Sequence, residues 1–216
     1  MNEIWIKHLQ YTNMLQEALS SISSEELRKA FLLIKNNLST TLYTMGNGGS
    51  AAIAEHFIVD YTKGIHIDNV SSQTPRVWPN PHPISEKDKN GRAISLCSNL
   101  PLITAISNDV GYEYIFSEQL RYMPSYSNSD TCIAITASGN SPNIINGLKQ
   151  ARIMRMNTIA LVGFNGGIIL KENLADIIIH VNMDNYGIVE DTHHVIMHFI
   201  TQQLRRELNP YETIIL

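Results

Sequence analysis

Apolar positions near the start of the chain follow a helical period. Between residues 3 and 38 they recur every three to four positions, which predicts two amphipathic helices. Ser23 followed by Glu26 predicts the start of the second helix, because the serine hydroxyl can cap its first amides while the glutamate reaches back. Two such helices ahead of the first strand must cover an apolar surface. We therefore expect residues 1–38 to lie at a subunit interface.

From residue 40 onward, short apolar runs alternate with amphipathic segments. The predicted strands are 41–45, 93–97, 130–135, 158–162 and 176–181, and the predicted helices between and after them are 50–61, 112–123, 142–154 and 190–208. This alternation predicts an α/β fold with three layers, in which helices flank both faces of a parallel five-stranded sheet. The strands are continuously apolar, as strands buried on both faces should be. A proline-containing stretch at 64–92 is expected to form an extended loop.

Composition narrows the class of protein. A length of 216 residues suits one domain covering 1–216, and 44% apolar residues suffice for a packed core. A formal net charge of −4 without a long basic run favours neither nucleic acid nor membrane as a partner. Cys97 and Cys132 lie in apolar runs, which is typical of reduced core thiols. With no secretory leader and no apolar stretch of membrane-spanning length, we expect a cytoplasmic location.

Two glycine- and hydroxyl-rich segments follow predicted strands and precede predicted helices. They are Gly46-Asn47-Gly48-Gly49-Ser50 and Thr136-Ala137-Ser138-Gly139-Asn140-Ser141. A helix N-terminus offers free amides and a positive dipole end, so it can hold a phosphate without a lysine or arginine. Either segment alone is equally consistent with an ordinary turn, but two at strand-to-helix junctions of one sheet favour a phosphosugar site.

Histidines and carboxylates gather on two predicted helices. His56 and Asp60 lie four residues apart, and Glu190, His194 and His198 share the same spacing. This spacing places each set on one helical face. Their nitrogen and oxygen atoms suit zinc, although other divalent first-row metals also accept them.

The segments 46–50, 107–112 and 138–141, taken in order, resemble the sugar isomerase (SIS) domain, and within it the sedoheptulose 7-phosphate isomerases. This resemblance spans nearly the whole chain and implies a flavodoxin-like SIS fold and a homotetramer. The implied activity is conversion of sedoheptulose 7-phosphate to D-glycero-D-manno-heptose 7-phosphate, for the heptose of lipopolysaccharide or capsule. The second loop departs from the usual Ser-Thr-Ser by carrying Thr136 and Ala137.

The resemblance also implies roles for individual residues. By position it implies a zinc ion bound by His56, Asp60, Glu190 and His198, with Asp60 and His198 also as acid and base. The implied substrate-binding residues are Asn47, Gly48, Ser50, Asn108, Asp109, Thr136, Ala137, Ser138, Ser141 and Glu190.

The chain departs from the family pattern at three of these places. Asp60 stands for a glutamate, Glu190 for a glutamine, and Gly187 for an aspartate. We interpret His194 as a solvated neighbour of the metal set and His180 as structural.

Other functions remain open at this point. A relative of these isomerases binds the replication initiator DnaA as a non-catalytic tetrameric scaffold. A different sugar-phosphate isomerase, or a sensing domain, would share the same loops. Asp60 and His198 could act as ligands or as acid and base, and the sequence leaves both roles open.

Overall fold

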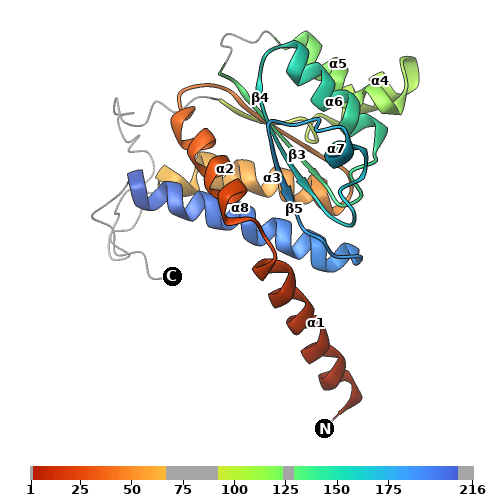
Figure 1. Ribbon diagram of the computed structural model, residues 1–216. Coiled ribbons are helices and arrows are strands. Elements are labelled where there is room, and N and C mark those ends of the chain that lie inside the picture. Colours follow the sequence, from red (N-terminus) through yellow and green to blue (C-terminus); the bar gives the residue numbers. More distant parts are fainter. Residues whose placement is uncertain (1, 67–91, 124–128, 209–216) are drawn as a thin grey trace, which may run out of the picture.

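The computed structural model describes residues 2–66, 92–123 and 129–208 (Figure 1). Most of the predicted 64–92 loop lies outside these ranges. At its start, Gly64–His66 forms a single 3-10 turn, η1. Within the described ranges, no helix combines the length and apolar character needed to cross a bilayer.

A five-stranded sheet forms the middle layer, and all its strands run parallel. The strands are β1 Leu42–Gly46, β2 Ala93–Ser95, β3 Thr131–Thr136, β4 Asn157–Val162 and β5 Ile177–His180. Their order is β2-β1-β3-β4-β5. This is the flavodoxin-like order, in which the chain reverses its direction of growth between β1 and β3. The predicted fold class is therefore confirmed, and the switch point between these two strands is where such folds bind ligands.

Helices cover both faces of the sheet (Figure 1). They are α1 Glu3–Ser20, α2 Ser24–Asn36, α3 Gly49–Thr62, α4 Leu100–Asp109, α5 Ile115–Tyr122, α6 Pro142–Ile153, α7 Gly167–Lys171 and α8 Tyr186–Leu208. Alternate strand residues face opposite layers: Ile133 and Ile135 pack toward α2, α3 and α8, whereas Cys132 and Ala134 pack toward α4 to α7. Burial raises the pKa of Cys132 to about 12, so this thiol behaves as an inert core residue.

Several helices differ from the sequence predictions in their presence or their bounds. Residues 107–109, which belong to one of the segments that carry the family resemblance, form the last turn of α4, a helix that the sequence predictions did not include. The start of this helix depends on two local features that an apolar pattern does not include. Asn99 Oδ1 accepts a 3.2 Å hydrogen bond from the Leu102 amide, and Pro101 lies in the first turn. Helix α8 begins at Tyr186, four residues before its predicted start, and α7 was not predicted.

Helix α1 extends away from the three layers (Figure 1). It is tied to α8 by Tyr11, whose hydroxyl donates a 2.6 Å hydrogen bond to Asp191 Oδ2. This bond, with help from burial, raises the pKa of Tyr11 to about 12. Beyond this contact, large apolar side chains such as Ile4 and Trp5 are 70% and 51% exposed. Their role in a subunit interface stays a prediction.

Candidate active site

The first loop turns sharply from β1 into α3. Gly48 has φ +55°, a left-handed conformation that side chains rarely adopt. At Gly46 the backbone of the first helical turn is so close that an added Cβ would lie 2.5 Å from the Ser50 carbonyl oxygen. These two glycines set the free amides at the start of α3 at the carboxyl edge of the sheet, where an anion can reach them.

The second loop is held from behind by the turn that follows β4. Gly139 has φ +65°, and a Cβ there would lie 2.1 Å from the carbonyl oxygen of Gly166. Asn140 Oδ1 accepts a 2.9 Å hydrogen bond from the amide of Ile168. Ser138 Oγ accepts a 3.3 Å bond from the Asn140 amide. These contacts fix the backbone of the loop, which is what the predicted phosphate site needs.

An amide pair joins the two loops. Asn47 Nδ2 donates to Asn143 Oδ1 at 2.9 Å, and Asn143 Nδ2 donates back to Asn47 Oδ1 at 2.8 Å. The hydroxyl of Tyr112 adds a 3.1 Å hydrogen bond to Asn47 Oδ1. Asn143 is 1% exposed on the first turn of α6, so this pair links the two loops through a partly buried contact. Asn47, predicted to bind substrate, thus also sets the spacing of the loops.

Replacing Asn143 with alanine should weaken binding at the phosphate end. The substitution leaves the Asn47 amide without its buried partner, a loss of about 1–3 kcal/mol. We expect KM for a sugar phosphate to rise by roughly tenfold, with a smaller change in kcat. Steady-state kinetics and phosphate inhibition measure this effect. Asn146→Ala, on the same helix but bonded to the Glu113 carbonyl, serves as the control. Equal KM values for both variants would contradict the loop-spacing role.

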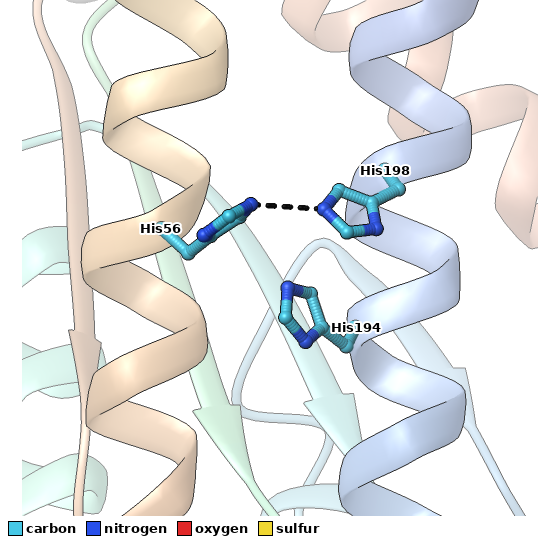
Figure 2. Close-up of side chains that lie close together, drawn as sticks. All are labelled: His56, His194 and His198. Atoms are coloured by element: carbon cyan, nitrogen blue, oxygen red, sulfur yellow. Dashed lines mark hydrogen bonds between the residues drawn. The ribbon is translucent and has the colours of Figure 1, made fainter.

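Three histidines from the helices α3 and α8 converge (Figure 2). His56 on α3 faces His194 and His198 on α8, and one ligand atom from each of the three lies within 4.8 Å of the others. His56 Nε2 and His198 Nε2 are 2.9 Å apart. The Asp60 carboxylate lies at their side, with Oδ2 3.5 Å from His56 Nε2 and 3.4 Å from His198 Nε2.

This group fits a divalent metal ion. Three imidazole nitrogens beside an available carboxylate are a donor set that zinc accepts, and this count leaves a position open for substrate. The Nε2 atom of His194 is buried and has no hydrogen-bond partner among the described residues, as expected of a nitrogen reserved for a metal. Burial, followed by the charges of His198 and His56, lowers the pKa of His194 and so favours the neutral ring that binds metal.

His194 and Glu190 occupy places that the sequence interpretation did not give them. His194 is a member of the histidine group and not a solvated neighbour. Glu190 lies one turn earlier on α8, against the first loop: a Cβ added to Gly49 would be 2.3 Å from Glu190 Oε2. A metal-ligand role for Glu190 stays a prediction, and its position suits contact with a ligand held by that loop.

The other predicted residues are spread around this edge. Thr136, the last residue of β3, and Ala137, which follows it, are both buried. Asn108 and Asp109 are exposed at the end of α4, with Asn108 Nδ2 donating to Asp109 Oδ1 at 2.8 Å. Among the described residues, neither side chain forms a hydrogen bond with the two loops.

Two further histidines lie outside the histidine group. His180 Nε2 lies 2.8 Å from the Phe164 carbonyl oxygen and steadies the turn after β4, in line with its structural interpretation. His193 is fully buried, and burial lowers its pKa to about 4, so this ring stays neutral near pH 7.

Curated relatives of this chain are named phosphoheptose isomerases. No family model matches the chain. A probable phosphoheptose isomerase of Thermoplasma acidophilum is 34% identical over 159 residues, covering 74% of this chain and 75% of that protein. The chain belongs to the phosphoheptose isomerase family. The phosphoheptose isomerase of Helicobacter pylori strain P12 is 28% identical over 200 residues, which is 92% of each chain.

Solved phosphoheptose isomerases share the fold. The enzyme from Neisseria gonorrhoeae superposes with a TM-score of 0.74 at 25% identity, covering 93% of this chain and 96% of that one. The enzyme from Francisella tularensis gives the same TM-score at 24% identity, covering 95% of this chain and all of that one. Sequence reasoning gave no role to Asn143 or Tyr112, and it placed His194 beside the metal set and not within it. Of these, only His194 carried a sequence signal, its four-residue spacing from His198.

Proposed function

We propose that this chain interconverts sedoheptulose 7-phosphate and D-glycero-D-manno-heptose 7-phosphate in heptose biosynthesis. The observation that carries the proposal is the convergence of His56, His194 and His198, with Asp60 beside them, next to two preformed phosphate loops in a phosphoheptose isomerase family chain. Such a site can hold a sugar phosphate at one end and rearrange the other.

The phosphate end binds at the two loops. Backbone amides at the starts of α3 and α6 and the hydroxyls of Ser50, Ser138 and Ser141 supply donors without a fixed positive charge. Neutral donors hold a dianion firmly enough for turnover and still release the product. The remaining sugar chain then extends between α3 and α8 toward the histidines.

The reacting end lies at Asp60 and His198. Asp60 removes a proton from C1 of the ketose and later delivers a proton to C2, while His56, His194 and His198 would hold the zinc ion. A bound zinc ion would polarise the carbonyl as a Lewis acid. This division assigns Asp60 the proton and the three histidines the metal, so the ligand and base roles no longer compete for one carboxylate.

Metal removal tests this assignment. We expect about one zinc ion per chain by elemental analysis, and chelation should reduce isomerase activity to background. Adding zinc back should restore the activity. Inorganic phosphate should still bind at the two loops of the chelated protein. Full activity in protein shown to be metal-free would contradict the proposed site.

A non-catalytic scaffold would contain no zinc ion and would show no isomerase activity, because a scaffold has no use for a metal site beside a phosphate site. The homotetramer and the cytoplasmic location stay expectations that accompany the proposed enzyme. Size-exclusion chromatography with light scattering measures the first.

A further inference from the structure

A cavity opens on the far side of the histidine group, toward the C-terminal end of α8. Its volume is about 330 Å³, and its described lining consists of Asp60, Gly64, His198, Thr201, Gln202 and Arg205. Asp60 is the residue to which the proposed function assigns the proton transfers, and His198 is one of the histidines that would hold the zinc ion. The reacting carbons of the substrate must therefore lie in or at the mouth of this cavity.

The sequence builds the cavity from one helical face and one glycine. His198, Thr201, Gln202 and Arg205 follow one another at spacings of three, one and three, so they line successive turns of the same face of α8. On the opposite wall, Gly64 adds no side chain. A Cβ at Gly64 would already contact the Asp60 Cβ at 3.7 Å, so a larger side chain would project into this space.

The polar groups of the lining differ in what they can offer a ligand. Thr201 Oγ1 already donates within its helix, to the carbonyls of Met197 and His198 at 3.2 and 3.0 Å. The Gln202 amide makes no hydrogen bond with the described residues, so it can both donate and accept. Arg205 is partly buried and, among the described lining residues, alone carries a permanent positive charge. Its guanidinium carries five donors, enough to serve a ligand in addition to a protein partner.

The proposed reaction develops negative charge at this place. When the proton leaves C1 of the ketose, the C–H electrons form the C1–C2 double bond and the carbonyl electrons move onto O2. The resulting enediolate collapses to the aldose when a proton returns to C2 and the proton on O1 passes to O2, leaving a carbonyl at C1. Atoms and charge balance without an added reactant, but the intermediate carries a full negative charge in a partly enclosed site.

We infer that Arg205 is a further catalytic residue, whose guanidinium hydrogen-bonds to the enediolate oxygens, and that Gln202 positions the C1 end beside it. This inference rests on the proposed isomerase function. The donors sit where charge forms in the transition state, not where the phosphate binds, so they should act mainly on kcat. Loss of one such donor typically lowers kcat by about 10²–10³-fold.

The test compares Arg205→Met and Arg205→Lys with Arg206→Met. Arg206 is the next residue on α8, is also partly buried, and does not line the cavity. We expect Arg205→Met to lower kcat by about 100-fold with little change in KM, and Arg205→Lys to recover part of this loss. Arg206→Met should retain wild-type kinetics. Zinc content should be equal in all four proteins, which separates a role toward the substrate from a role in holding the metal.

Inhibitors distinguish a catalytic from a merely structural arginine. A hydroxamate analogue of an aldose phosphate mimics the planar, anionic enediolate, whereas a reduced sugar-alcohol phosphate mimics only the substrate chain. Arg205→Met should lose about 100-fold in affinity for the hydroxamate and keep its affinity for the alcohol phosphate. Free guanidinium ion should partly restore its turnover.

The outcomes also separate this inference from the function on which it rests. Equal kcat values for wild type and Arg205→Met, or equal losses of affinity for both inhibitors, would overturn the role of Arg205 and leave the isomerase intact. Absence of turnover in the metal-loaded wild-type protein would overturn both together.

Discussion

Replacing Asp60 with asparagine should lower the isomerase kcat by about 10²–10⁴-fold while the protein keeps its metal ion. The amide has nearly the same shape as the carboxylate but cannot accept the proton from carbon, and general base catalysis is worth about this factor. Asp60 Oδ2 lies 3.4–3.5 Å from two histidine nitrogens, so it is close to the reacting centre. The three histidines remain to bind the metal in this variant.

The matched variant is His198→Ala, which removes one of the three nitrogens. We expect this protein to lose both its metal ion and its turnover, while inorganic phosphate still binds at the loops. Elemental analysis beside steady-state kinetics reads out both properties. If Asp60→Asn lost the metal as completely as His198→Ala, Asp60 would be a ligand and the division of roles between carboxylate and histidines would be wrong.

Replacing Gly139 with alanine should remove most of the affinity for the phosphate end. The new Cβ would lie 2.1 Å from the Gly166 carbonyl oxygen, and the left-handed φ of +65° is itself unfavourable for alanine. Because the nearest atoms all belong to the backbone of Gly166 and Gly167, the second loop must shift to relieve the contact. We expect the free energy of unfolding to fall by about 2–4 kcal/mol and KM to rise by at least roughly tenfold.

Gly48→Ala separates the two causes of this effect. Gly48 also has positive φ, at +55°, but a Cβ there would meet no atom within 4 Å. It should therefore show the strain of the backbone without the clash, and a smaller loss of stability than Gly139→Ala. Chemical denaturation gives the stability of each variant, and inhibition by inorganic phosphate gives the affinity. A Gly139→Ala protein with wild-type phosphate affinity would contradict a rigid second loop.

The sheet could be predicted from the sequence because its strands are continuously apolar and each is followed by a turn or loop. Ile133 and Cys132 point to opposite faces, yet both are buried, and that pattern arises only when helices cover both sides. The start of α4 was missed for the opposite reason. It depends on the cap at Asn99 and on Pro101, which are local signals that an apolar period does not contain.

The site could be predicted only in part, because helical spacing gives the face of a residue but not its depth or its partner. Spacing placed His56 and Asp60 together, and His194 with His198, but it could not show which helix faces meet across the site. The close approach of Glu190 to Gly49 depends on how α8 lies against α3. The bond between Asn47 and Asn143 joins residues 96 positions apart, a contact that no local pattern encodes.

The central claim is that this site moves a proton between the first two carbons of a seven-carbon sugar phosphate. The most direct measurement is NMR of sedoheptulose 7-phosphate incubated in D₂O with the zinc-loaded protein. The account predicts that signals of the aldose heptose 7-phosphate appear with deuterium at C2, and that Asp60→Asn slows both product formation and exchange by about 10²–10⁴-fold. Neither product nor deuterium incorporation with the zinc-loaded wild-type protein would contradict it.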